Sequence, residues 1–200
     1  MLAHFDAGQH IILENDRARL EPLEKKHFEY LVPLAMEKEL WKLTSVFIKD
    51  ETDFKNYFDE AITEKENNNQ WPYAVYDKLT GEYAGSTRFG SFAAPHSRME
   101  IGWTWYNKNA RGSGLNMASK HLLLTHAFTK LNLNRIELKT SLLNERSQKA
   151  MHKLGAEKEG ILRRHMVNYD GTLRDSVYFS FIKEEWPETE KKYFSPYTDL

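Results

Sequence analysis

The sequence contains no cysteine, no long apolar run and no excess of charge of either sign. Without cysteine there is no disulfide, no thiolate metal ligand and no cysteine nucleophile. No segment approaches the roughly 20 apolar residues that a membrane-spanning helix needs. The first residues also lack the basic and apolar segments of a secretory signal. We therefore expect a cytoplasmic protein that does not enter a membrane.

The charge balance narrows the possible partners. The 28 Lys and Arg residues nearly cancel the 29 Asp and Glu residues, for a formal net charge of −1. A protein that binds nucleic acid generally shows a basic excess, so no direct contact with nucleic acid is expected. The eight histidines have no zincin-like spacing, and no metal site is predicted.

Repeats, low-complexity tracts and Pro/Gly/Ser-rich linkers are also absent, and only six prolines occur in 200 residues. A chain of this length can bury one sizeable core. We therefore expect one domain over residues 1–200, as a monomer or a homodimer. Residues 184–200 are polar and are expected to form a C-terminal tail.

Hydrophobic periodicity predicts an alternation of helices and strands. Helices are expected at 25–40, 51–67, 115–131 and 145–154, and strands within 10–23 and at 71–77, 82–92, 98–106, 135–140, 159–168 and 173–182. The pair Asp170-Gly171 indicates a hairpin between the last two strands. Asn144 and Gly155 suit the N-cap and the C′ position of the helix between them. This order predicts a mixed α/β fold with a cleft along one sheet.

The strand "RMEIGWTWY" (98–106) alternates between two kinds of side chain. Strand geometry would place Met99, Ile101, Trp103 and Trp105 on an apolar face and Glu100, Gly102, Thr104 and Tyr106 on the other. The side chains of both tryptophans are therefore expected in the core rather than against a substrate.

The segment "NARGSGLN" (109–116) precedes the predicted helix at 115–131. Backbone N–H groups at a helix start lack partners within the helix, and the helix dipole favours negative charge there. Gly112 and Gly114 would let that backbone approach a phosphate closely, and Arg111 adds a cation. The alternative is a plain glycine-containing turn. The segment matches neither a P-loop nor a dinucleotide-binding fingerprint, which needs a third glycine where Met117 stands.

The same segment resembles the Q/R-x-x-G-x-G/A loop of the GNAT superfamily of acetyl-CoA-dependent N-acetyltransferases. More specifically, the chain is similar to the RimJ/RimL-type branch, which acetylates N-terminal amines of ribosomal proteins. Five segments carry the resemblance in family order: GEYAGSTRF (81–89), MEIGWTWY (99–106), RGSGLN (111–116), NERSQKAMHKLGAEKEGILR (144–163) and RDSVYFS (174–180).

The resemblance implies a GNAT fold, with a splayed, mostly antiparallel sheet flanked by helices and a C-terminal β-hairpin. The strands at 98–106 and 135–140 would part and admit the pantetheine arm of acetyl-CoA, the acetyl donor. The residues expected to bind this co-substrate are Trp103, Thr104, Trp105, Arg111, Gly112, Ser113, Gly114, Leu115, Asn116, Asn144 and Ser147. A backbone N–H near Trp103 to Trp105 would stabilise the oxyanion.

The chain departs from the superfamily pattern at three positions. Asn116 stands where Gly or Ala is usual, and Ala156 replaces a common aromatic residue. Met151 stands where many members carry a tyrosine that protonates the departing thiolate.

Acetyl transfer to an amine needs a neutral amine, a stabilised oxyanion and a proton for the thiolate. Glu100 is the candidate base, and its alternative role is an ion pair with Arg98 or Arg88. Glu137 is a second choice, but its alternation with charged residues is typical of a solvated face. For the thiolate proton, Ser147 is the candidate and Ser141 the alternative.

The sequence therefore predicts direct acetyl transfer from acetyl-CoA to an amine, without a metal or a covalent enzyme intermediate. The preferred acceptor is the N-terminal amine of a protein or peptide. Two alternatives stay open: a small-molecule amine as acceptor, and a non-catalytic module that binds acyl-CoA.

Overall fold

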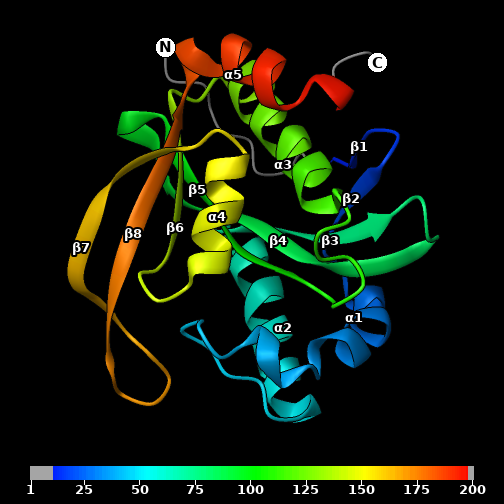
Figure 1. Ribbon diagram of the computed structural model, residues 1–200. Coiled ribbons are helices and arrows are strands. Elements are labelled where there is room, and N and C mark those ends of the chain that lie inside the picture. Colours follow the sequence, from blue (N-terminus) through cyan, green and yellow to red (C-terminus); the bar gives the residue numbers. More distant parts are fainter. Residues whose placement is uncertain (1–10, 198–200) are drawn as a thin grey trace.

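The computed structural model describes residues 11–197, which form one eight-stranded sheet with helices on both faces (Figure 1). The strand order is β1-β2-β3-β4-β5-β6-β8-β7. The strands are β1 (Leu13–Glu14), β2 (Ala18–Pro22), β3 (Trp71–Asp77), β4 (Glu82–Ala93), β5 (Arg98–Tyr106), β6 (Arg135–Ser141), β7 (Glu157–Val167) and β8 (Leu173–Ile182). The mixed α/β fold predicted from the sequence is confirmed, including the hairpin of β7 and β8.

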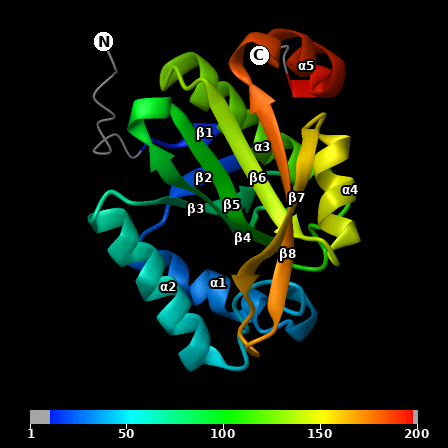
Figure 2. The same ribbon diagram turned by 90° about the vertical axis from the view of Figure 1, so that its left-hand side faces the viewer.

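The functional geometry begins where the sheet opens. All neighbouring strands pair antiparallel except β5 and β6, which run parallel and pair only from Arg98 and Arg135 to Glu100 and Glu137. Beyond that point the two strands separate, as the resemblance implied. Figure 2 shows β5 and β6 side by side at the centre of the sheet.

Two hydrophobic clusters fix the helices to the sheet. One packs the sheet against α3 (Leu115–Thr125), α4 (Glu145–Lys153) and α5 (Trp186–Tyr193), and the other packs it against α1 (Phe28–Ala35) and α2 (Glu51–Glu66). The two faces are named here the α3 face and the α2 face. No helix within residues 11–197 combines the length and the apolar character of a bilayer-spanning segment.

A β-bulge in β5 changes which side chains share a face. Gly102 pairs with Arg88 and Trp105 with Ser86, so β5 holds one residue more than β4 over this interval, and Trp103 has a φ of 51°. The expectation of strict alternation is therefore wrong beyond Gly102. A bulge places one extra residue on one strand and reverses the side-chain phase after it.

The reversal sorts the apolar residues of β5 between the two clusters. Met99 and Ile101 join the α3-face cluster, whereas Trp105 is buried on the α2 face with Trp103 packed against the same cluster. Tyr106 lies on the α3 face, and Thr104 contacts a side chain of α3. Glu100 and Thr104 therefore lie on opposite faces.

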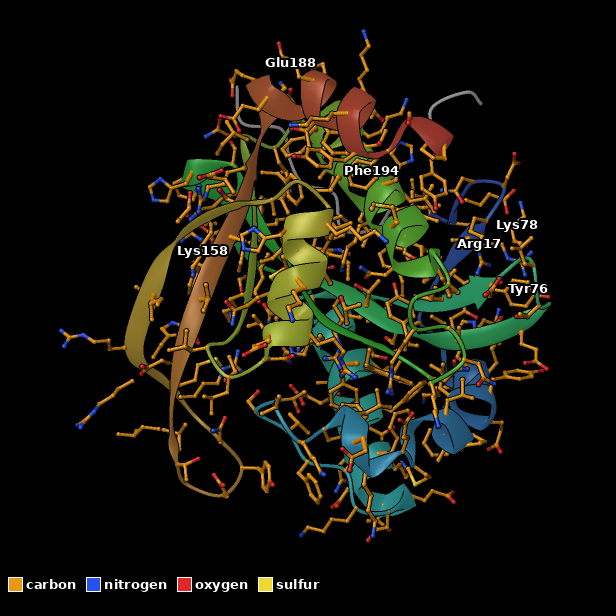
Figure 3. All side chains as sticks on the ribbon, viewed as in Figure 1. Arg17, Tyr76, Lys78, Lys158, Glu188 and Phe194 are labelled. Carbon is orange, nitrogen blue, oxygen red and sulfur yellow. The ribbon has the colours of Figure 1, made fainter. Side chains whose placement is uncertain are left out.

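The C-terminal segment is not the polar tail expected from its composition. A short 3-10 helix at Lys183–Glu185 leads into α5, whose Trp186 is 4% exposed, and Phe194 just beyond it is fully buried. Figure 3 shows Phe194 beneath α5, facing α3. These aromatic anchors are spaced too widely to stand out in a strongly charged segment. Residues 198–200 lie outside the described residues.

Most other predicted elements are confirmed, with two differences at helix ends. The expected helix at 25–40 is a 3-10 turn at Lys25–His27, α1, and a second 3-10 turn at Lys38–Leu40, because Glu37 adopts an extended conformation. The helix expected to reach residue 131 changes to a π-helix at His126–Lys130. Asn144 caps α4 through a 3.1 Å bond from the Ser147 amide, and Gly155 follows its end with a φ of 83°.

Candidate active site

A cavity of about 460 Å³ lies where β5 and β6 separate. It brings together ten of the predicted site residues: Glu100, Trp103, Thr104, Trp105, Arg111, Gly112, Gly114, Asn116, Asn144 and Ser147. Ser113 and Leu115 do not line it. Leu115 is fully buried in the α3-face cluster, and the Ser113 hydroxyl donates to the Ala110 carbonyl at 2.8 Å.

The loop before α3 presents backbone N–H groups to this cavity. Within the described chain, the amides of Gly112, Gly114 and Asn116 have no hydrogen-bond acceptor, and all three residues line the cavity. Gly112 and Gly114 have φ values of 75° and 91°, a left-handed conformation that favours glycine. These three amides, named here the amide cradle, are backbone donors free at a helix start, an arrangement that suits an anion.

The Arg111 side chain does not project freely toward that site. Its two terminal nitrogens donate to the two carboxylate oxygens of Glu37 at 2.9 and 2.7 Å, and its Nε donates to the Tyr106 carbonyl at 3.0 Å. These contacts tie the loop to the end of β5 and to the segment after α1. Arg111 therefore fixes the position of the amide cradle, and Glu37 balances the charge of its guanidinium.

Helix α4 supplies the opposite wall of the cavity. Asn144, Ser147 and Met151 all line it, and Met151 is 9% exposed. A methionine at this position carries no proton to donate. Ser147, one helical turn before Met151, supplies a hydroxyl on this wall.

Glu100 sits on the α2 face at the point where the strands part, and it is only 6% exposed. Its carboxylate accepts hydrogen bonds from Lys139 of β6 and from the Ser91 hydroxyl, the latter at 3.2 Å. The expected partners of Glu100 are engaged elsewhere. Arg98 pairs with Glu137 at 2.8 Å, while the guanidinium of Arg88 lies over the Tyr57 ring.

Glu137, the second candidate base, is not among the residues that line the cavity. Arg98 and Arg135 hold its carboxylate, the latter through a 2.9 Å contact. The sequence pattern favoured a solvated face at Glu137, whereas its side chain is 14% exposed and held in ion pairs. Glu100 is the acidic residue that lines the cavity among residues 11–197.

Lys120 of α3 is a site residue that the sequence analysis missed. It lines the cavity, is 4% exposed, and donates to the hydroxyls of Thr104 and Thr87 at 2.7 and 3.2 Å. Burial without a facing carboxylate lowers the pKa of Lys120 to about 7. A lone lysine within an amphipathic helix gives no sequence signal, because only the packing of α3 shows that it points inward.

The cavity as a whole is electropositive. Its lining includes one acidic residue and six basic ones, namely Arg111, Lys120, Lys139, Arg146, Lys153 and Arg174. Carboxylates balance Arg111 and Lys139, and burial lowers the pKa of Lys120 to about 7. Arg146, Lys153 and Arg174 remain to attract an anionic ligand.

An open sheet with an amide cradle at its parting strands defines the class of the protein. Residues 17–157 match the family model described as an acetyltransferase (GNAT) domain. The chain belongs to the GNAT acetyltransferase family.

Named relatives agree with this assignment. The uncharacterised N-acetyltransferase p20 of Bacillus licheniformis is 34% identical over 114 residues, which cover 57% of this chain and 63% of p20. The Bacillus subtilis protein YdaF, named provisionally as a ribosomal N-acetyltransferase, is 28% identical over 186 residues, 88% of this chain and 97% of YdaF. The chain thus spans less than two thirds of p20 but nearly all of YdaF.

A solved structure shows the same fold at lower identity. Mycobacterium smegmatis RimJ, determined in complex with CoA-disulfide, superimposes with a TM-score of 0.76 at 21% identity, covering 90% of this chain and 91% of RimJ. At this identity the match concerns the fold.

Proposed function

We propose that the protein transfers the acetyl group of acetyl-CoA directly to an amine, and that the acceptor is the N-terminal amine of a protein or peptide. One observation carries the proposal: three unpaired backbone amides of the α3 loop open into the same cavity as the buried carboxylate of Glu100. The first group suits a diphosphate, and the second suits an amine that must lose a proton. The name of YdaF supports the choice of acceptor.

Each step of the transfer can be given to a residue of this chain. Glu100 accepts the proton of the acceptor amine, directly or through water, as the nitrogen attacks the thioester carbon. An α-amino group titrates near ~8, so part of an N-terminal amine is already neutral near neutral pH and a single carboxylate suffices as base. The backbone at the Trp103 bulge would offer an N–H group to the oxyanion, because the extra residue of a bulge is left unpaired in the ladder.

The carbon–sulfur bond then breaks, and the sulfur leaves with the electron pair and takes a proton. Ser147 is the proposed donor, because Met151 cannot supply one. Asn144 would contact the pantetheine arm while capping α4. The amides of Gly112, Gly114 and Asn116 would bind the diphosphate.

A two-stage experiment tests the proposal. Thermal-shift titrations with acetyl-CoA, CoA, ATP and NAD first establish the ligand class, and stabilisation by the two CoA species alone is expected. A thiol-release assay against pooled N-terminal peptides and small amines then identifies the acceptor. Turnover with small amines only would replace the peptide acceptor by a small molecule. Binding of acetyl-CoA with no turnover at all would leave a non-catalytic acyl-CoA-binding module.

A further inference from the structure

Arg174, at the start of β8, is a buried cation without a counter-ion. It is 8% exposed and lines the cavity. No hydrogen bond or ion pair from residues 11–197 reaches its guanidinium, and its Nε is buried without a partner. Burial lowers the pKa of Arg174, and the negative charge of Glu100 acts against that shift.

The strand register places Arg174 on the same face of the sheet as Glu100. Lys139, which holds Glu100, stands opposite Tyr178 in the pairing of β6 with β8. Side chains alternate along a strand, so Arg174, Ser176 and Tyr178 share that face. Both Glu100 and Arg174 therefore point to the α2 face.

The amide cradle, which is expected to bind the diphosphate of the coenzyme, lies on the other face of the sheet. Val177 and Phe179, which alternate with the residues just named, belong to the α3-face cluster, and the cradle amides lead into α3 itself. Arg146 and Lys153, the other cavity cations without a carboxylate partner among residues 11–197, lie on α4 and therefore come from that side. Arg174 is thus separated from the cations that would meet a phosphate.

A buried guanidinium is costly unless an anion pairs with it. The acidic residue that lines the cavity, Glu100, is already bound to Lys139 and Ser91. The partner of Arg174 must therefore come with a ligand. Guanidinium presents a planar pair of donors that matches a carboxylate, and its proximity to Glu100 means that the ligand is the acceptor.

We propose that Arg174 binds a carboxylate of the acceptor and thereby positions the amine at Glu100. The substrate class is an amine that carries a carboxylate nearby, which is either a peptide with an acidic residue near its N-terminus or a free amino acid. This inference rests on the proposed acetyl transfer, and it specifies the acceptor.

The experiment compares matched acceptors with wild type, Arg174→Gln and Arg174→Lys. Short peptides with Asp or Glu in the first three positions are paired with their Asn or Gln counterparts, and free amino acids with their amides. Thiol release gives kcat/KM for each pair. Arg163→Gln is the matched control, because Arg163 is an exposed arginine of β7 that does not line the cavity.

For wild type and Arg163→Gln, kcat/KM should be roughly ten- to a hundredfold higher with the carboxylate-bearing acceptors than with their amide counterparts, either among the peptides or among the amino acids. This is the size expected for one charge-assisted hydrogen-bonded pair. Arg174→Gln should lose this preference while retaining turnover of the amide series, and Arg174→Lys should retain part of it. The series in which the preference appears distinguishes peptides from amino acids.

Calorimetry with the same acceptor pairs in the presence of CoA reads the preference without turnover. If wild type bound the carboxylate-bearing acceptors more tightly but turned over none of them, the carboxylate site at Arg174 would stand and the proposed catalysis would be refuted. Equal binding and turnover of acid and amide by wild type, or an unchanged preference in Arg174→Gln, would overturn the inference. If Arg174→Gln lost acetyl-CoA binding selectively, the inference would also be overturned, because Arg174 would then bind the coenzyme and not the acceptor.

Discussion

Glu37 and Arg111 form a two-pronged ion pair, with nitrogen–oxygen distances of 2.9 and 2.7 Å, between the segment after α1 and the loop that enters α3. The two residues are 74 positions apart in sequence. Because the pair anchors the loop, Glu37 should matter for coenzyme binding although it does not line the cavity.

A double-mutant cycle tests this anchoring role. Glu37→Gln and Arg111→Gln should each weaken acetyl-CoA binding by calorimetry, and the double variant should be little weaker than Arg111→Gln alone, because both changes break one contact. If Arg111 instead met the phosphates directly, Glu37→Gln would strengthen binding by releasing a cation. Additive losses would also contradict the anchor.

Gly112→Asp should reduce acetyl-CoA affinity by about tenfold or more, because a carboxylate in the amide cradle repels a diphosphate. Gly171→Asp is the matched control: both glycines have positive φ, at 75° and 80°, and neither has a heavy atom within 4 Å of an added Cβ. Aspartate tolerates this conformation better than most residues, so the backbone cost is similar. Equal affinity of the two variants in a thermal-shift titration would refute the cradle.

Glu100→Gln should lower kcat/KM by roughly 10²- to 10⁴-fold, the usual contribution of general-base catalysis. Raising the pH should restore part of the activity, since more of the acceptor amine is then neutral. Glu137→Gln removes the same charge from β6, where Arg98 and Arg135 hold it. Glu137→Gln should lower the free energy of unfolding far more than it lowers kcat/KM. Full turnover of Glu100→Gln at every pH would eliminate Glu100 as the base.

Lys120 should make folding stability depend on alkaline pH. Its pKa falls from 10.5 to about 7 on burial, so between these values the unfolded chain binds a proton that the folded chain does not. Stability contributed by this group therefore rises as the pH increases from about 7 to about 10.5. Lys120→Met should lack this rise, and the difference between the urea-unfolding curves of wild type and variant isolates it. A constant difference across this range would contradict the neutral, buried amine.

Phe194 should be essential to the C-terminal helix. It is fully buried and lies 5.4 Å from Trp186, measured between ring centroids. Phe194→Ala should cost about 3–5 kcal/mol of unfolding free energy, because it leaves a cavity. Glu188→Ala, at an exposed position of α5, should cost less than about 1 kcal/mol. Similar urea midpoints for the two variants would show that the segment contributes little to the core.

Patterns local to the chain determined much of the fold. The bounds of the strands 71–77, 98–106 and 173–182 are those predicted from hydrophobic periodicity and turn signals, and the cap at Asn144 follows from one side chain and the helix beside it. The glycines of the α3 loop could also be predicted, since their positive φ is a requirement of the turn itself. Each of these features depends on neighbours within a few residues.

Tertiary packing decided the features that depend on distant residues. A bulge in β5 moved Trp103 and Trp105 away from the face of Met99, because its place depends on the pairing with β4. Strand register gave Glu100 its partner Lys139, 39 positions away.

The same holds for two basic residues of the cavity that sequence periodicity could not reveal. Lys120 and Arg174 are ordinary polar residues in their own helix and strand, and only the fold turns both into one cavity. The sequence by itself therefore determined where a loop with left-handed glycines would lead into a helix. The packing of the sheet decided which charged side chains line the cavity, because side-chain burial is settled only when distant elements come together.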